Sequence, residues 1–535
     1  MMNNREIASI IQLLGNLMEL QGVPDFRTKS YHFAARSIKS LEQELVDMPQ
    51  ETIENIPGIG KAISSKIIEL ISTGNLQLLE TYLQKTPAGI IEIFQIKGIG
   101  PKKIKLLWEE LDIESIGELL YACNENRLIT IKGFGVKTQQ NIKEQIEFIQ
   151  KNASYFIWAN LEPLVNEILV EIKEQFPKLL IETVGDFANK KIVLEKITFL
   201  IGTEQLQIIE QLQQQFIQYP IEFISCTPSK FYLKRIELTT TEDFDILKKS
   251  MANQQEFSIE TAVYESAQIP FIAPEFRDIA NIHQLAKEGL LNNIIELKDI
   301  KGIIHTHTKY SDGSNTIEEM AQHCMHKGFE YLVISDHSKS AFYANGLSVE
   351  RILEQHQEID QLNLKYPNFK IYKSIESDIL YDGSLDYEDN VLQMFDLVIA
   401  SVHSNLRMTE EKAMERLIKA IENPHTTILG HLTGRLLLSR KGYPINHQKV
   451  IDACAENDVV IELNANPNRL DIDYKWIDYC QQKNVKIAIN PDAHNLEGIA
   501  DVRFGVIAAR KGLLFKHNTL NTLSQSEFDD FISKS

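Results

Sequence analysis

Two histidines separated by one residue stand near the middle of the chain, where an apolar run ends. The run Ile303-Ile304 is typical of a buried strand, and His305 and His307 come directly after it. Because alternate residues of a strand share a face, both imidazoles can point at one site, with Asp312 folding back over it from the next loop. A histidine on its own most often has a structural role, so the function of this pair depends on which other ligand-type residues accompany it.

The same arrangement recurs along the second half of the chain. Seven short β-rich runs end in hydrophilic side chains, and amphipathic helical stretches lie between many of them. Strands that alternate with helices favour parallel βα units, and a closed parallel barrel has its active site at the C-terminal ends of its strands. The ligand-type residues at these ends are His305, His307, Asp312, His337, Glu376, His403, His431, Asp492 and His494.

These nine side chains predict a site for more than one metal ion. Imidazole and carboxylate groups without thiolate suit zinc, manganese or iron, and nine ligands exceed one tetrahedral site. We therefore expect two or three divalent ions, manganese or zinc. Clustered metals generate hydroxide near neutral pH and clamp the oxygens of a phosphate ester. His323 and His326, three residues apart on a helix, are expected to lie on its solvated face.

Residues 299–535 resemble a PHP (polymerase and histidinol phosphatase) domain. The matching motifs are His305-Thr306-His307, Asp336-His337, Glu376, His403, Gly430-His431 and Asp492-Ala493-His494. The resemblance implies a distorted seven-stranded (β/α)7 barrel and a trinuclear metallo-phosphoesterase centre with all nine ligand positions filled. By itself it does not separate a small-molecule phosphatase from a nuclease.

The composition indicates a multidomain protein of a reducing compartment. A chain of 535 residues predicts about three domains, and 43% hydrophobic residues suffice for packed cores. Five scattered cysteines, an N-terminus unlike a signal peptide and no apolar run of membrane-spanning length predict a cytoplasmic protein without a membrane partner. The net charge of −19 disfavours nucleic-acid binding through a broad basic patch, but not through backbone amides.

A short glycine signature appears three times in the N-terminal region, each time between helical stretches. Its glycines are Gly58 and Gly60, Gly98 and Gly100, and Gly133 and Gly135. Two glycines around one apolar residue permit a tight turn, and the helix that follows offers free N–H donors to a phosphate. The repeats resemble helix-hairpin-helix motifs, which bind the DNA backbone without reading its sequence.

Residues 1–152 as a whole resemble the lyase and fingers region of family X DNA polymerases. In that family a lysine after the first hairpin forms a Schiff base with a 5′-deoxyribose phosphate, and Lys66 matches its position. Such chemistry needs an amine of depressed pKa. A solvated helix lysine is the alternative interpretation of Lys66.

Residues 153–274 stand where this family has its polymerase palm, a nucleotidyltransferase-like domain whose Asp-x-Asp pair binds two catalytic metals. Lys196 and Thr198 occupy the positions of the two aspartates, and a lysine repels a cation. Glu237 is the acidic residue left near a family carboxylate position. Asp243 and Asp245 form another Asp-x-Asp, but they follow Glu237 and so come in the wrong order. We expect a palm kept as scaffold, with a degenerate polymerase site.

The whole chain thus resembles a bacterial family X DNA polymerase fused to a PHP domain, with residues 275–298 as linker. We expect a DNA-repair phosphoesterase that works as a 3′–5′ exonuclease or processes 3′ ends. His305, His307, Glu376 and Asp492 would be catalytic, and Arg435 or Lys339 would neutralise phosphate charge. The alternatives are an active family X polymerase, a histidinol-phosphatase-like enzyme for small molecules, and a DNA-binding scaffold. Protein partners are not predicted.

Overall fold

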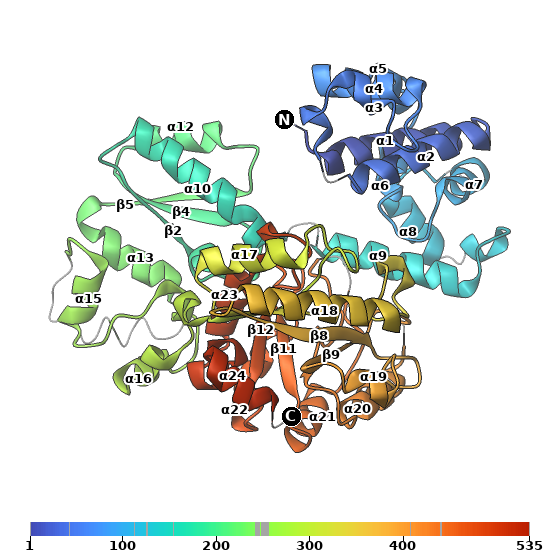
Figure 1. Ribbon diagram of the computed structural model, residues 1–535. Coiled ribbons are helices and arrows are strands. Elements are labelled where there is room, and N and C mark those ends of the chain that lie inside the picture. Colours follow the sequence, from blue (N-terminus) through green and yellow to red (C-terminus); the bar gives the residue numbers. More distant parts are fainter. Residues whose placement is uncertain are drawn as a thin grey trace. The chain divides into compact units, whose positions relative to one another are not determined.

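The computed structural model describes residues 2–41, 43–111, 113–124, 127–152, 155–240, 247, 256–406, 408–438 and 441–533. The chain divides into two compact units, Met1–Ala153 (unit 1) and Ser154–Ser535 (unit 2) (Figure 1). Asp243 and Asp245 lie outside the described residues.

Helices build the described part of unit 1. They are α1 (Asn4–Leu20), α2 (Asp25–Lys39), α3 (Gln50–Ile53), α4 (Lys61–Thr73), α5 (Gln77–Leu83), α6 (Ala88–Ile93), α7 (Pro101–Leu111), α8 (Ile116–Asn124) and α9 (Val136–Asn152), with 3-10 turns at Leu45–Asp47 and Leu128–Thr130. Helix α1 starts at a capping box in which Asn3 and Glu6 bond each other's backbone N–H. It buries Ile7, Ile11 and Leu14 at helical spacing, so unit 1 has a core of its own.

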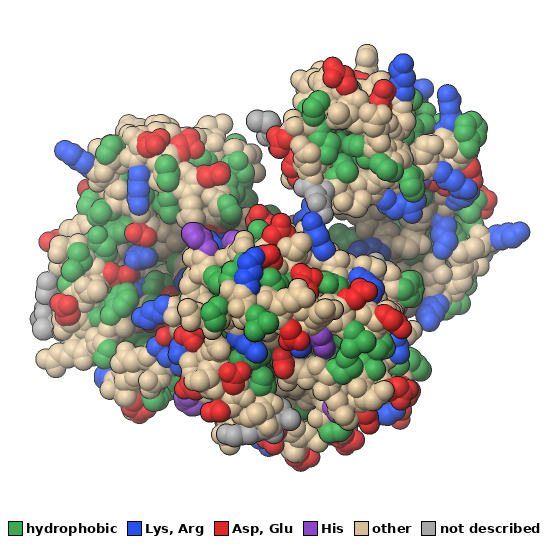
Figure 2. All heavy atoms as spheres, viewed as in Figure 1, with side chains coloured by type: hydrophobic (Ala, Val, Ile, Leu, Met, Phe, Trp, Pro, Cys, Tyr) green, Lys and Arg blue, Asp and Glu red, His purple; other side chains and the backbone are tan. Residues whose placement is uncertain are grey.

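Three turns of unit 1 share one backbone conformation. Gly58, Gly98 and Gly133 have φ angles of 89°, 90° and 99°, and the second glycine of each signature precedes α4, α7 or α9. A side chain at such a φ is strained, which explains the glycine. Lysine and arginine side chains are scattered over the visible face of this unit (Figure 2).

The first part of unit 2 is a small mixed sheet with helices. Its elements are β1 (Phe156–Ile157), α10 (Trp158–Gln175), β2 (Leu180–Val184), α11 (Gly185–Ala188), β3 (Val193–Leu194), β4 (Ile197–Gly202), α12 (Leu206–Gln215), β5 (Ile221–Cys226), α13 (Phe231–Thr239) and α15 (Glu260–Ser266). Strand β4 pairs antiparallel with β2 and parallel with β5, whereas β1 and β3 form a separate antiparallel pair.

The second part of unit 2 is a parallel barrel surrounded by helices. In chain order the elements are α16 (Ile282–Lys287), β6 (Gly302–Thr306), α17 (Ile317–Lys327), β7 (Tyr331–Ile334), α18 (Val349–Lys365), β8 (Lys370–Asp378), α19 (Asp389–Leu392), β9 (Leu397–Ser401), α20 (Glu410–Ile421), β10 (Ile428–Leu429), α21 (His447–Glu456), β11 (Val460–Asn464), α22 (Ile477–Gln482), β12 (Ile487–Asn490), α23 (Val502–Lys511) and α24 (Gln525–Ile532). The seven strands pair in the order β6 to β12, every neighbour parallel.

The barrel nearly closes between its first and last strands. The backbone N–H of His307 donates to the carbonyl of Ala493 at 2.8 Å, and that of Ala493 donates to the carbonyl of His305 at 3.3 Å. The His-x-His at the end of β6 therefore lies beside the Asp-Ala-His after β12, although the two motifs are far apart along the chain. This confirms the predicted fold class of a distorted (β/α)7 barrel.

The small sheet and the barrel share one hydrophobic core, and ion pairs join them. We expected residues 275–298 to be a linker, but Glu275 is buried and its carboxylate lies 2.9 Å from a guanidinium nitrogen of Arg510 on α23. Arg503, also on α23, pairs with Glu162 on α10 at 2.7 Å. The small sheet with its helices, which we call the palm-like segment, thus packs on the barrel as part of one unit.

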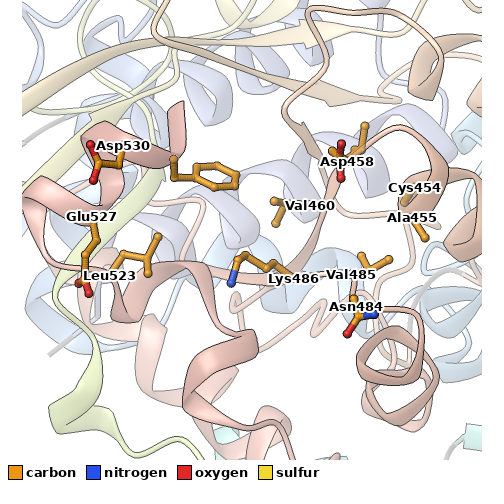
Figure 3. Close-up of a pocket in the computed structure, with 12 residues that line it drawn as sticks. Cys454, Ala455, Asp458, Val460, Asn484, Val485, Lys486, Leu523, Glu527 and Asp530 are labelled. Atoms are coloured by element: carbon orange, nitrogen blue, oxygen red, sulfur yellow. The ribbon is translucent and has the colours of Figure 1, made fainter. Parts of the chain in front are cut away.

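A cavity of about 460 Å³ lies at the end of the barrel opposite the predicted ligands (Figure 3). Val460, at the start of β11, forms part of its wall, together with Leu523 and Phe531 near the C-terminus. Because parallel barrels keep chemistry at the C-terminal strand ends, we assign this cavity to the packing of α24 on the barrel. None of the helices that the structure describes combines the length and apolar character needed to cross a bilayer.

Candidate metal centre

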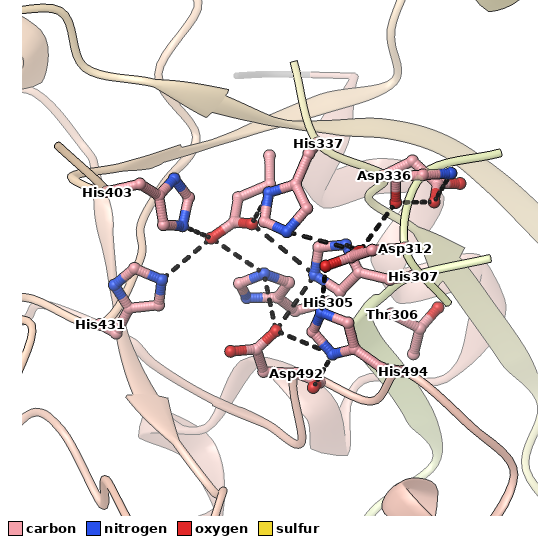
Figure 4. Close-up of polar contacts among 12 residues, drawn as sticks. His305, Thr306, His307, Asp312, Asp336, His337, His403, His431, Asp492 and His494 are labelled. Atoms are coloured by element: carbon pink, nitrogen blue, oxygen red, sulfur yellow. Dashed lines mark hydrogen bonds and ion pairs between the residues drawn. The ribbon is translucent and has the colours of Figure 1, made fainter. Parts of the chain in front are cut away.

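Glu376 is the centre of the ligand cluster. Figure 4 shows the rings of His305, His337, His403 and His431 gathered in one place. Its Oε1 lies 3.0 Å from Nε2 of His431, 3.1 Å from Nε2 of His403 and 3.2 Å from Nε2 of His305. Its Oε2 lies 2.9 Å from Nδ1 of His337. His305 on β6 and three histidines that follow β7, β9 and β10 thus meet around the carboxylate of Glu376 on β8.

The other predicted ligands continue the cluster on the side where the barrel closes. Nε2 of His307 lies 3.1 Å from Oδ1 of Asp492, and Nε2 of His494 lies 3.4 Å from Oδ2 of Asp312. His305 and His307 are fully buried beneath a cavity of about 290 Å³, which the other seven ligands line. The structure therefore brings all nine predicted ligands together.

The donor atoms group in a way that suits divalent metal ions. Three sets place their ligand atoms within 4.8 Å of one another: His307, Asp312, His337 and His494; His305, His307 and Asp492; and His337, Glu376 and His403. Among the described residues, His431 Nδ1 is buried without a hydrogen-bond partner, whereas His305 Nε2 and His337 Nδ1 lie at ion-pair distance from Glu376. Imidazole nitrogens gathered around carboxylates are a donor set that divalent cations bind, so these residues fit bound cations.

Two ligands adopt a backbone conformation that the sequence did not indicate. His305 has a φ of 65° and Asp492 a φ of 53°, both in the left-handed region. Our prediction had His305 and His307 share a face by strand alternation, but that rule needs an extended backbone at His305. The two rings instead meet because β6 is irregular at this point. Non-glycine residues at positive φ gather at functional sites, where the surrounding structure must hold them.

A second layer of carboxylates orients the histidines, and sequence reasoning missed it. Glu462, buried on β11, lies 2.6 Å from Nδ1 of His305, and Asp378, at the end of β8, lies 2.5 Å from Nδ1 of His403. A carboxylate on one ring nitrogen leaves the other for a metal. An acidic residue inside the apolar run Val460-Ile461-Glu462-Leu463 was the available signal, because a buried charge needs a partner.

The electrostatics of the cluster keep its carboxylates charged. Burial acts to raise the pKa of Glu376, but His403, His305 and His337 hold it well below its usual value. Burial, together with the neighbouring His494 and His337, lowers the pKa of the His307 imidazole to about 3. Burial acts to lower the pKa of His337 and His403, but Glu376 raises these to about 11 and about 9. These rings can bind a metal only after losing that proton, so metal binding should release protons.

The predicted phosphate-neutralising cations lie elsewhere. Arg435 is not among the residues that line the ligand cavity, because its guanidinium is bound 2.7 Å from Asp473 and donates to the carbonyls of Arg469 and Leu470. Lys339 lies over the ring of Tyr387 beside another cavity. Among the described residues, the cation that lines the ligand cavity is Arg469, which the sequence reasoning did not select.

In unit 1 the predicted DNA-binding glycines lie in turns, and the predicted lyase residue Lys66 lines a cavity. A β-carbon built on Gly98, Gly100, Gly133 or Gly135 would meet nothing within 4 Å, whereas one on Gly58 would lie 2.2 Å from the ring of Phe33. The second and third turns are therefore open, and Phe33 covers the first. Lys66, on α4, lines a cavity of about 1030 Å³ with Arg27, Lys29 and Lys61, and its amine donates to the carbonyl of Ala62 at 3.4 Å.

In the first part of unit 2, the two residues predicted to replace the polymerase aspartates form ordinary contacts. Lys196 pairs with Glu222 at 2.7 Å, and Thr198 lies opposite Glu222 in the pairing of β4 with β5. Glu237 lies on helix α13 and pairs with Lys234 at 3.2 Å. The potential metal clusters found among the described residues all lie in the barrel.

Comparison with known proteins agrees with this geometry. Residues 2–76 match a helix-hairpin-helix domain, residues 90–147 a SAM-like helix-hairpin-helix tandem, and residues 304–466 a PHP domain. A probable phosphatase of Caldicellulosiruptor saccharolyticus is 27% identical over 253 residues, 43% of this chain and 94% of its own. Another, from Caldanaerobacter subterraneus subsp. tengcongensis, is 29% identical over 171 residues, 30% of this chain and 60% of its own.

One relative matches from end to end. The DNA polymerase/3′-5′ exonuclease PolX of Bacillus subtilis (strain 168) is 30% identical over 575 aligned residues, which cover 100% of both chains. That similarity spans the hairpins, the small sheet and the whole barrel, including Asp492 and His494, which lie beyond the matched PHP region. The chain belongs to the PolX family, the bacterial family X DNA polymerases that carry a C-terminal PHP domain.

Proposed function

We propose that the protein is a metal-dependent 3′–5′ exonuclease that trims DNA 3′ ends during repair. The observation that carries this proposal is the cluster of nine imidazole and carboxylate ligands around Glu376, with donor atoms in three groups that each lie within 4.8 Å of one another. The Bacillus subtilis relative is named as a 3′-5′ exonuclease, which supports this choice over other phosphoesterases. The five cysteines are unpaired, in keeping with a cytoplasmic setting.

The nine ligands would hold two or three divalent ions, manganese or zinc. Bound there, such ions lower the pKa of water and neutralise the charge of a phosphate diester. Hydrolysis consumes one water: its hydroxyl group stays on phosphorus, the P–O3′ bond breaks, and a proton ends on the released 3′ oxygen. The products are a nucleoside 5′-monophosphate and a strand one nucleotide shorter. Glu462 and Asp378 hold the histidine rings of His305 and His403 in place throughout.

Unit 1 would hold the DNA through its hairpin turns. Helix-hairpin-helix regions match on both sides of residue 80, and the turns at Gly98 and Gly133 are sterically open. Amides at a helix N-terminus bind phosphate without adding formal charge, which suits a chain of net charge −19. The lyase role of Lys66 stays a prediction, supported by the cationic cavity that this residue lines.

The polymerase site would be inactive. The residues at the aspartate positions are Lys196 and Thr198, and the neighbouring Glu222 is already neutralised by Lys196. Nucleotidyl transfer needs carboxylates that anchor two cations. A family X polymerase that still extends primers is the competing function, and a small-molecule phosphatase is the other.

One assay separates these functions. DNA labelled at its 5′ end and, separately, at its 3′ end is incubated with the protein and manganese, with and without nucleotides. We expect a ladder from the 5′ label, release of labelled mononucleotide from the 3′ label, and no extension. His305→Ala and Asp492→Asn should abolish both signals while the melting temperature of unit 2 stays within a few degrees. Hydrolysis of histidinol phosphate without any DNA cleavage would instead identify a small-molecule phosphatase.

A further inference from the structure

Arg469 is the cation best placed to meet a substrate phosphate. It lines the same cavity as Asp312, Glu376 and Asp492, whose side chains are anionic. A phosphate diester brings two charged oxygens into this pocket. The planar guanidinium fork can donate to both oxygens at once, which a lysine ammonium cannot do in the same geometry.

The Arg469 guanidinium has no partner among the residues that the structure describes. It carries five N–H donors, yet none of the described residues forms a hydrogen bond or ion pair with it. Other arginines of unit 2 are engaged: Arg416 donates to the carbonyl of Ser404, Arg503 pairs with Glu162 and Arg510 pairs with Glu275. Half-buried and facing a cavity of ligands, Arg469 has donors left for a bound anion.

The backbone of Arg469 is held firmly although its side chain is free. Nε of Arg435 donates to the carbonyl of Arg469 at 3.0 Å, and Nη2 of Arg435 donates to the carbonyl of Leu470. Nη1 of Arg435 is fixed in turn by Asp473 at 2.7 Å. The N–H of Arg469 donates to the carbonyl of Asn466 at 2.8 Å. Arg435 therefore clamps the loop from which Arg469 reaches the cavity.

We propose that Arg469 binds the nonbridging oxygens of the scissile phosphate and that Arg435 is the positioning residue that holds its loop. This rests on the proposed phosphodiesterase function, and it names the phosphate contact of that site. The charge on the nonbridging oxygens is present in the substrate and persists through hydrolysis. Arg469 should therefore contribute both to binding and to the rate of the chemical step.

The test compares Arg469→Gln, Arg469→Lys and Arg469→Gly with the wild-type chain on single-stranded DNA in manganese. We expect kcat/KM to fall at least 50-fold in Arg469→Gln, and Arg469→Lys to recover part of the loss. Metal content per chain should equal that of the wild type, because Arg469 binds no metal. Millimolar guanidinium chloride should raise the activity of Arg469→Gly at least fivefold, a rescue that a structural role would not give.

Arg503→Gln is the matched control, since it removes an arginine of the same unit that pairs with Glu162 away from the cavity. It should keep kcat/KM within twofold. Arg435→Met should lower kcat/KM, and guanidinium should not restore it. In the double variant Arg435→Met/Arg469→Gln, the fold-loss of kcat/KM should be smaller than the product of the two single fold-losses. If Arg435→Met does not fold, the Arg469 series decides alone.

Two failures are distinguishable. A wild-type chain with full metal content that does not cleave DNA overturns the proposed nuclease function. A wild-type chain that cleaves DNA while Arg469→Gln keeps kcat/KM within twofold, or while guanidinium fails to rescue Arg469→Gly, overturns the role of Arg469.

Discussion

Nδ1 of His305, on the first barrel strand β6, lies 2.6 Å from Oε2 of Glu462, a buried carboxylate on β11. Glu462 also accepts from the backbone N–H of His431 at 3.0 Å and from the amide of Asn490 at 2.9 Å. One side chain thus fixes the ring of one ligand and the backbone of another.

Glu462→Gln should therefore weaken metal binding without unfolding the barrel. Carboxylates that orient ligand histidines contribute about 10–100-fold to metal affinity, and the amide of glutamine would meet the Asn490 amide donor. The dissociation constant for manganese, measured by calorimetry on the metal-free protein, should rise by about that factor. Asp458→Asn, at the opposite end of the barrel, should leave it unchanged. Equal affinities in wild type and Glu462→Gln would show that the His305 ring needs no such support.

The second hairpin offers a matched test of DNA binding. Gly98→Ala places a β-carbon at a φ of 90°, which costs about 1–2 kcal/mol and distorts the turn. Gly74→Ala, at a φ of 72° after α4, carries a similar strain outside the three glycine turns, and both β-carbons meet open space. Both variants should lose similar stability, but only Gly98→Ala should lower duplex affinity, by about fivefold in fluorescence anisotropy. A loss of affinity in both would attribute the effect to stability.

The palm-like segment makes a negative prediction. On our proposed alignment Lys196, which pairs with Glu222, and Thr198 replace the metal-binding aspartates, so we expect that the chain does not extend primers. The measurement is primer extension by His305→Ala, in which degradation cannot hide synthesis. Nucleotide-dependent extension that disappears when Asp243 and Asp245 are both changed to asparagine would place a working polymerase site in the segment outside the described residues.

His356 predicts a pH dependence of stability. Its ring packs edge-on against Phe395 and is buried, and burial, with Lys373 nearby, lowers the pKa of the imidazole from 6.5 to about 4. In the unfolded chain this histidine takes up a proton below about pH 6.5, whereas the folded ring stays neutral until about pH 4. The free energy of unfolding should therefore fall as the pH drops from 6.5 to 4, by up to about 3 kcal/mol.

Urea unfolding of the metal-free wild type and of His356→Leu, followed from pH 7.5 to pH 4, measures this contribution. The leucine variant should show a smaller acid loss over that window. Parallel curves for the two proteins would mean that His356 is accessible to protons in the folded state.

The sequence identified nine residues that the structure brings together, because metal chemistry restricts which residues can stand at strand ends. His305, Glu376 and Asp492 could each be recognised from residue type and position, and their convergence followed from a parallel barrel. The positive φ of His305 could not be recognised from the sequence, since it arises where β6 meets the segment after β12 at the closure of the barrel. Arg469 was missed because its loop is placed by long-range bonds from Arg435.

In the palm-like segment, too, contacts between distant parts of the chain could not be predicted from the sequence. Helix α13 places Glu237 beside Lys234, and the packing of Glu275 against Arg510 joins two segments that looked separate along the chain. Both outcomes depend on tertiary contacts, which override local pattern.

The central claim is that the nine-ligand cluster binds the metal ions on which DNA hydrolysis depends. The most direct measurement is manganese titration of the metal-free full-length chain, with bound metal and 3′–5′ exonuclease activity recorded on the same samples. We predict that activity rises with occupancy and saturates at two or three ions per chain, and that Asp492→Asn loses at least one ion together with the activity. Full exonuclease activity in the metal-free chain, or in Asp492→Asn with its metal content unchanged, would contradict the account.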